Sequence, residues 1–319
     1  MNSIIIDGMS FTLPLFIIAV GGIYSERSGV TNLALEGFLG AGGFFGALFV
    51  AFTSSWFAAS SQAPMYFAIA ISMLGGALYA MLHAVLCIHF KANQVISGVV
   101  VNIIAMALTD FLTSQINAQV FGASSDRFVL AVSNRVTIPV LSSIPVLGAF
   151  FTDVYPYEFI IIVVAIAAWY LLYKTTFGMR LRACGDNPHA VDAAGADVAK
   201  IRYIAIAISG ALSGLGGICF AYSIYSSYSA SIYTGYGYLA IAALIFGNWK
   251  ILPTFWACVL FGFARSGGYK IVQVLGMPST YSDLIMILPY VLTLLLLIFF
   301  SKNNQAPRAL GDIYDKGKR

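Results

Sequence analysis

Charged side chains are scarce in this sequence: Asp, Glu, Lys and Arg together make up 9% of its 319 residues. Soluble domains carry about 25% charged residues. Because 60% of the residues are hydrophobic, a globule of this length could not give its surface enough polar cover. An ordinary soluble fold is therefore excluded, whereas a lipid bilayer accepts apolar helices of about 20 residues.

Residues that serve catalysis or bind metals are also few. The sequence has four cysteines and three histidines, at no spacing typical of a metal site, a redox pair or an HExxH motif. It contains no GxxxxGK[ST] loop to hold a nucleotide phosphate. We therefore expect no disulfide, no metal, no cofactor and no enzymatic activity. The net charge of +4 is mild and its basic residues lie mainly in loops, so nucleic acid is not an expected partner.

Apolar segments dominate what is present, and they predict an all-α polytopic membrane protein with about nine transmembrane or broken helices, within a range of eight to ten. The segments are 4–23, 36–57, 65–88, 94–116, 157–173, 202–222, 236–248, 252–275 and 283–300. The first lacks a basic start and a cleavage site, so we expect it to be retained as a span. The seventh is short and is expected to be a broken or re-entrant helix, which needs cover from protein or a water-filled cavity.

The distribution of Lys and Arg predicts an outer N-terminus and a cytoplasmic C-terminus. In this orientation, the basic residues of the inner loops and tail are Arg27, Lys91, Lys174, Arg180, Arg182, Lys200, Arg202, Lys250, Lys302, Arg308, Lys316, Lys318 and Arg319. Only Arg127 and Arg135 fall clearly outside. We therefore expect a transmembrane domain over 1–301 and a cytoplasmic tail over 302–319.

Two further patterns predict packing. The outer loop 117–156 is long and contains three prolines, so we expect a small cap or re-entrant hairpin there. Small residues recur four apart in three pairs: Gly42 with Gly46, Gly210 with Gly214, and Gly262 with Ser266. This spacing lets helix backbones approach closely. We expect such packing inside one subunit, with packing between two subunits as the alternative.

The predicted cytoplasmic loop 174–201 contains a short helix signal. Asp186 or Asn187 can cap a helix, Pro188 suits its first turn and Gly195 can end it. A helix of about seven residues is marginal in water and needs a docking surface. Its small face, which a partner could approach closely, comprises Ala190, Ala193 and Ala194. The alternative is an ordinary connecting helix on the membrane surface.

The same loop resembles the coupling segment of bacterial ABC importer permeases of the branched-chain amino acid, ribose and nucleoside group. The matching residues are Arg182, Ala183, Gly185, Asp186, Asn187, Pro188, Ala193, Ala194 and Gly195. Further resemblances follow in the family's order, closest to the nucleoside permeases: Ser25 to Gly37, Lys91 to Asn102, Gly235 to Pro253, and the tail from Pro307. Gln94 stands where the family more often has an acidic residue.

The resemblance implies a type II ABC importer permease fold in the bacterial cytoplasmic (inner) membrane. It implies a separate ATPase subunit that seats the short helix, and an extracytoplasmic substrate-binding protein or lipoprotein. A second homologous permease would complete the path; this chain resembles the shorter partner, which favours a heterodimer over a homodimer. Nucleosides are the implied small-molecule substrate, with ribose-like sugars, riboflavin or branched-chain amino acids as alternatives.

Polar and aromatic residues in or near the spans are candidates for the translocation path, because such groups are costly when they face lipid. They are Asn93, Gln94, Asn102, Tyr222, Tyr225, Tyr228 and Arg265. Hydrogen bonding between helices is the alternative for Asn102, and an interfacial tyrosine belt is the alternative for the run from Tyr222 to Tyr238. For Asn32 and Glu36 we favour capping of the helix that starts near Leu33.

Two other classes stay open at this point. An ion-coupled secondary transporter needs intramembrane charges, of which Asp110 is the best candidate, although a water-facing position at a helix end is favoured for it. A membrane-embedded enzyme would need clustered His, Asp or Glu, and the histidines are scattered.

Overall fold

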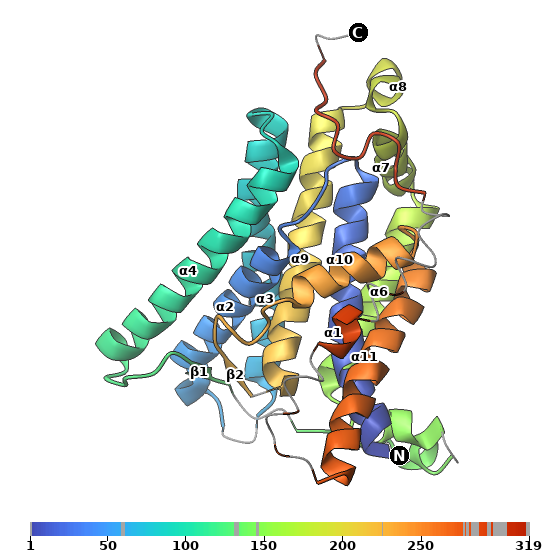
Figure 1. The fold of residues 1–319 in the computed structure, drawn as a ribbon. Coiled ribbons are helices and arrows are strands. Elements are labelled where there is room, and N and C mark those ends of the chain that lie inside the picture. The colour runs from blue at the N-terminus through green and yellow to red at the C-terminus, as the bar shows by residue number, and fades with distance from the viewer. Residues whose placement is uncertain are drawn as a thin grey trace.

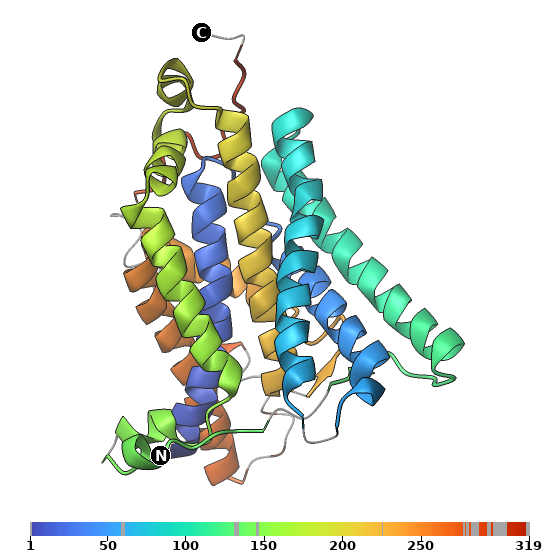
Figure 2. The ribbon, with the colours of Figure 1, turned by 180° about the vertical axis from the view of Figure 1, so that it is seen from behind.

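The chain folds into a bundle of α-helices with little other regular structure (Figures 1 and 2). The computed structural model describes residues 2–58, 61–130, 134–144, 147–224, 226–276, 278, 281, 287–291, 295 and 305–316. Its main helices are α1 (Asn2–Arg27), α2 (Leu35–Thr53), α3 (Ala63–Ala84), α4 (Gln94–Val120), α6 (Pro156–Lys174), α7 (Thr176–Asp186), α8 (Pro188–Ala193), α9 (Val198–Ile224), α10 (Tyr236–Phe246) and α11 (Ile251–Val274). Shorter elements are η1 (Ser54–Trp56), η2 (Val85–His89), β1 (Phe128–Val129), α5 (Pro139–Ser142), η3 (Leu147–Phe151) and β2 (Ser227–Tyr228).

Six described helices are long and apolar enough to cross a membrane: α1, α2, α3 with η2, α4, α6 and α9. The prediction of a polytopic all-α membrane protein is therefore confirmed. The seventh apolar segment forms α10, whose 11 residues span about 16 Å, about half of a 30 Å hydrocarbon core. The eighth forms α11, in which Arg265 and Lys270 lower the apolar character. The ninth, 283–300, lies mostly outside the described residues.

Glycine-rich contacts hold the centre of the bundle, where α9 packs against α1, α2 and α3. A Cβ added to Gly46 would lie 2.7 Å from the Ala68 carbonyl oxygen of α3. Gly214 of α9 meets both the Ser72 carbonyl and Gly42. Small residues at these positions let the helix backbones touch, which confirms the expectation of close packing within one subunit.

The outer helices differ in how they attach. α4 leans away from the bundle along much of its length (Figure 1), and among the described elements it is α2, α3 and η2 that touch it substantially. α6 lies on the side of α1 that faces away from α4 (Figure 2). Apart from Lys174 at the C-terminal end, the exposed large side chains of α6 are apolar or aromatic: Phe159, Ile162, Val163, Ile166, Trp169 and Tyr170. Such a surface suits contact with lipid acyl chains.

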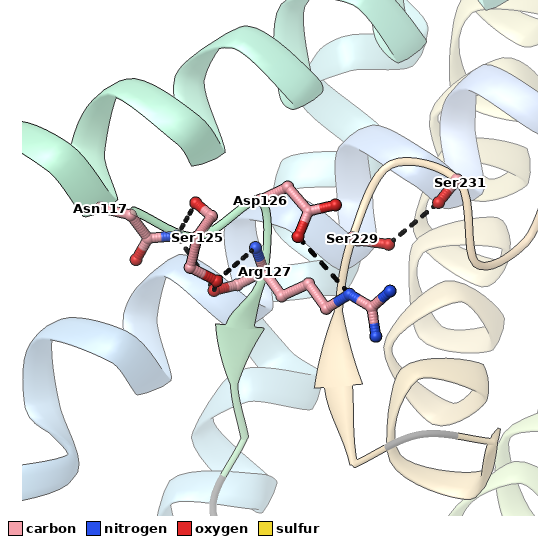
Figure 3. A network of polar contacts seen from close by, with 6 residues as sticks. All are labelled: Asn117, Ser125, Asp126, Arg127, Ser229 and Ser231. Carbon is pink, nitrogen blue, oxygen red and sulfur yellow. Dashed lines mark hydrogen bonds and ion pairs between the residues drawn. The ribbon is translucent and has the colours of Figure 1, made fainter. Parts of the chain in front are cut away.

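The loop between α4 and α6 forms the small cap that the sequence predicts. β1 pairs antiparallel with β2, so that Phe128 lies opposite Tyr228 across the two segments. Figure 3 shows the polar support of this pairing: Asn117 Nδ2 at the end of α4 donates to the carbonyl oxygens of Ser125 and Arg127, both at 2.9 Å. Farther along, Val136 and Val154 form an isolated bridge.

The glycine contacts give a stability prediction. In Gly214→Ala, the new methyl group would overlap the Ser72 carbonyl and force α3 and α9 apart, with an expected loss of about 1–3 kcal/mol. Thermal unfolding of the detergent-solubilised protein measures this loss. Gly267→Ala in α11 is the matched control, because its added Cβ meets nothing within 4 Å. Equal melting temperatures for the two variants would contradict the prediction.

Candidate functional site

The segment between α6 and α9 projects from one end of the molecule, where the C-terminal tail also lies (Figure 1). It contains two helices, α7 and α8, of which the sequence predicted only the second. Thr175 begins α7 by accepting a hydrogen bond from Gly178 N at 3.1 Å. Burial raises the pKa of the Cys184 thiol in α7 to about 11, so this thiol stays protonated at neutral pH.

α8 begins and ends as its sequence predicts, with Asn187 rather than Asp186 as the cap. The Asn187 side chain accepts a hydrogen bond from Ala190 N at 3.1 Å, and Pro188 occupies the first turn. Gly195 follows the helix with φ of +80°, a left-handed conformation that glycine adopts without strain. The helix has six residues, one fewer than expected.

The residues of the coupling motif divide into two groups. Gly185 packs against the Arg27 backbone, Pro188 is buried, and Arg182 lies over the Tyr173 ring at 5.3 Å. These residues hold the segment against the rest of the protein. The exposed residues of α8 and its C-terminal turn are His189, Ala190, Ala193, Ala194 and Gly195. Apart from His189 they are small, and they form the outer surface of this end.

The C-terminal tail packs against this segment. Ala309 N donates to the Gly185 carbonyl at 2.8 Å, and Gly311 N donates to the Gly29 carbonyl at 3.1 Å. Two ion pairs extend the contact: Lys91 to Asp315 at 2.9 Å and Lys316 to Asp192 at 3.5 Å. Residues 305–316 therefore tie α7 and α8 to the connection after α1 and to the turn before α4.

The connection between α1 and α2, residues 28–34, turns back into the bundle before α2 starts (Figure 1). Several of its backbone polar groups have no partner within a helix, and side chains from other elements bond them. Gln94 accepts a hydrogen bond from Thr31 N at 2.6 Å. Asn102 donates to the Leu33 carbonyl at 2.7 Å and accepts from Gly37 N at 2.7 Å, which caps the first turn of α2.

Asn32 and Glu36 both have the structural roles favoured from sequence, but Glu36 caps a different helix. Asn32 accepts a hydrogen bond from Ala34 N at 3.0 Å, beside the start of α2. The Glu36 carboxylate accepts from Gly235 N and from Gly237 N, so it caps α10. A carboxylate at this position satisfies free amides and complements the positive end of the helix dipole.

A small cavity lies where α2, α4 and α10 meet. Its volume is about 190 Å³. The lining residues include Glu36, Asn102, Met106, Tyr233 and Tyr238. Asn102 Nδ2 also donates to Tyr238 Oη at 3.1 Å, so Asn102 bonds between helices and lines the cavity at once. Of the two roles weighed for Asn102, the interhelical hydrogen bonding is confirmed; a role in the path stays a prediction.

The other path candidates lie outside this cavity. Asn93 is exposed and caps α4, accepting from Val95 N at 3.0 Å. Tyr222 is buried in the core near Tyr157, and Tyr225 lies outside the described residues. Arg265 is half-buried over the Phe11 ring at 4.6 Å.

The tyrosines of the run from Tyr222 to Tyr238 are mostly inside the protein, which corrects the expectation of an interfacial tyrosine belt. Tyr222, Tyr228, Tyr233 and Tyr236 are all buried. Tyr228 Oη lies 2.7 Å from Tyr233 Oη and 3.0 Å from the Gly40 carbonyl, which it bonds. The Tyr228 and Tyr233 hydroxyls find partners in the interior, so these rings can fill space between helices. Tyr238 is the exception, with 45% of its surface exposed.

Sequence reasoning missed two buried carboxylates, Glu26 and Glu158, of which Glu26 lies beside the α1–α2 connection. It accepts hydrogen bonds from Trp249 Nε1 and, at 3.5 Å, from Asn32 N. Arg27 Nε donates to the Trp249 carbonyl at 3.0 Å. The turn between α10 and α11 is therefore held by the end of α1. The sequence did carry a signal for Glu26. This residue lies at the end of an apolar span, within the segment that resembles the nucleoside permeases, and a carboxylate buried there requires a hydrogen-bond partner.

Comparisons with known proteins agree with this architecture. A family model described as "Branched-chain amino acid transport system / permease component" matches residues 4–298. The guanosine ABC transporter permease protein NupQ of Bacillus subtilis is 38% identical, over 97% of this chain and 95% of its own. The nucleoside ABC transporter permease protein NupC of Lactococcus lactis is 36% identical, over 99% of this chain and 97% of its own.

A second Bacillus subtilis protein, the guanosine ABC transporter permease protein NupP, is 25% identical over 95% of this chain and 82% of its own. No solved structure matches. The family match covers nearly all the described helices, including the two short helices that project beside the tail. The chain therefore belongs to the family of branched-chain amino acid transport system permease components, the multi-pass membrane subunits of ABC importers.

Proposed function

We propose that this chain is the permease subunit of an ATP-driven importer of nucleosides and forms half of the translocation path. The observation that carries the substrate class is similarity at 36–38% identity, over nearly full length, to two permeases named for guanosine and for nucleosides. Membership of an ABC permease family argues against the two alternatives, an ion-coupled secondary transporter and a membrane-embedded enzyme.

The exposed small face of α8 is proposed as the docking surface for a separate ATPase subunit. Its alanines let another backbone approach closely, and the capped ends hold a helix too short to be stable alone. The end of the molecule with α8 and the tail is accordingly cytoplasmic, and the N-terminus of α1 is outside. The basic residues Arg27, Lys91 and Arg202, which lie beside the tail, support this orientation.

The cavity beside Glu36 and Asn102 is proposed as part of the path. At about 190 Å³ it is smaller than the 300 Å³ or more of a complete ligand pocket, which fits a path with a second wall from another subunit. Two guanosine permeases of one organism both resemble this chain, which favours a heterodimer. An extracytoplasmic binding protein would deliver the substrate on the side of the β1–β2 cap.

The transport mechanism follows from the contacts of the coupling end. Closure of the ATPase pair on binding ATP moves α8. Gly185 and the tail connect this segment to the α1–α2 connection through Ala309 and Gly311. The same connection leads into Glu36 and the first turn of α2, beside the cavity. Displacement at α8 would thereby change the cavity, opening the path alternately to each side.

Substrate class is tested by uptake of labelled guanosine, uridine, ribose, riboflavin and leucine. Cells with and without this gene are compared, with the neighbouring subunits intact. We expect loss of guanosine and uridine uptake alone, since those substrates match the relatives' names. Loss of ribose, riboflavin or leucine uptake instead would keep the permease assignment and reject nucleosides.

The docking role of α8 is tested by Ala193→Trp. The indole would hold a docked subunit away, so we expect ATPase co-purification and uptake to fall roughly tenfold or more, because each 1.4 kcal/mol lost weakens a complex tenfold. Ala123→Trp, at an exposed alanine in the cap at the other end, is the matched control for ATPase co-purification. Wild-type co-purification by Ala193→Trp, at equal membrane levels, would refute the docking surface.

A further inference from the structure

Asp110 lies near the middle of a membrane helix. α4 runs from Gln94 to Val120, and continues for ten residues beyond Asp110. The side chain is exposed and has no hydrogen bond or ion pair among the residues that the structure describes. The sequence expectation of a helix-end position is therefore wrong, because α4 extends four residues past the predicted end of its apolar segment.

Two other charged side chains, near the ends of the spanning helices, are buried and have hydrogen-bond partners. Glu26 is buried against Trp249, and Arg202 is buried with hydrogen bonds to the Ser28 and Asp312 carbonyls. Both lie near helix ends. Asp110 has neither burial nor a described partner, although a carboxylate at this depth facing lipid is among the costliest placements in a membrane protein.

The surroundings of Asp110 point to a polar environment on this side of α4. Met106, one helical turn before Asp110, lines the cavity together with Asn102. Tyr233, whose hydroxyl lies 2.7 Å from that of Tyr228, lines the same cavity. Asp110 follows Met106 by four residues and therefore lies on the same face of α4, one helical turn from the cavity.

We propose that Asp110 lines the substrate path and accepts hydrogen bonds from the vicinal hydroxyls of the substrate's ribose. This rests on the proposed function, nucleoside import through a path between two permeases. A carboxylate has two oxygens and can accept from two neighbouring hydroxyls at once. The cavity one turn away is lined mainly by apolar and tyrosine side chains, which suit the flat face of a base.

Water access to position 110 is tested first, independently of the substrate. Asp110→Cys and Val163→Cys are placed separately in the assembled transporter and treated with a charged, membrane-impermeant thiol reagent. Cys87, Cys184, Cys219 and Cys258 are free but buried, which limits background labelling. Val163 on α6 is the matched control, since 65% of its surface is exposed and its neighbours are apolar. We expect labelling at position 110 only; equal lack of labelling would overturn the proposal.

Recognition of ribose is tested by comparing guanosine with 2′,3′-dideoxyguanosine. The wild-type transporter is expected to prefer guanosine, and Asp110→Leu to lose that preference by about tenfold, with Asp110→Asn between them, because hydrogen bonds to a charged group exceed those to a neutral one. An unchanged ratio in Asp110→Leu would overturn the proposal even if total uptake falls.

Together, the thiol-labelling and uptake experiments distinguish a failure of this inference from a failure of the proposed function. If the wild-type transporter takes up no nucleoside, the proposed substrate fails, while thiol labelling still reports whether residue 110 faces an aqueous path. If nucleoside uptake is normal and position 110 is inert to the reagent, the inference about Asp110 fails alone.

Discussion

Backbone groups that cannot bond within a helix constrain this fold more than any other factor. In hydrocarbon each unsatisfied amide or carbonyl costs several kcal/mol, yet residues 28–34 are non-helical and largely buried. The partners of this connection come from the whole chain: Arg202 for Ser28, Gly311 for Gly29, Ser25 for Val30, Gln94 and His83 for Thr31, Glu26 for Asn32, and Asn102 for Leu33. Every major segment that resembles the nucleoside permeases contributes to this network or is held by it.

The short helix α10 obeys the same constraint. Its N-terminal amides bond to the Glu36 carboxylate, and the turn after it is held by Glu26 and Arg27. Both ends of α10 are thus fixed by residues that flank one connection. A helix of 11 residues can lie at membrane depth only with such partners, which explains why distant motifs occur together in one sequence.

The membrane-spanning helices could be predicted because they follow from local apolar composition, and the ends of α8 from Asn187, Pro188 and Gly195, whereas the polar helix α7 carries no such apolar run. The partner of Glu36 could not, because a carboxylate in a first turn signals capping of its own helix, and only the tertiary fold brings Gly235 beside it. The buried tyrosines show a similar limit. Tyr228 and Tyr233 resemble interfacial residues in sequence, but each satisfies the other's hydroxyl in the interior.

Because of the tail, the packing of the end that contains α7 and α8 depends on the order in which the chain is synthesised. Residues 305–316 emerge from the ribosome after every described helix, yet Ala309 and Asp315 bond to elements made much earlier. A chain interrupted before residue 305 would present α8 without the contacts that join it to Gly29 and Lys91. Synthesis through residue 316 is therefore a condition for the contacts that hold α7 and α8 against the rest of the protein.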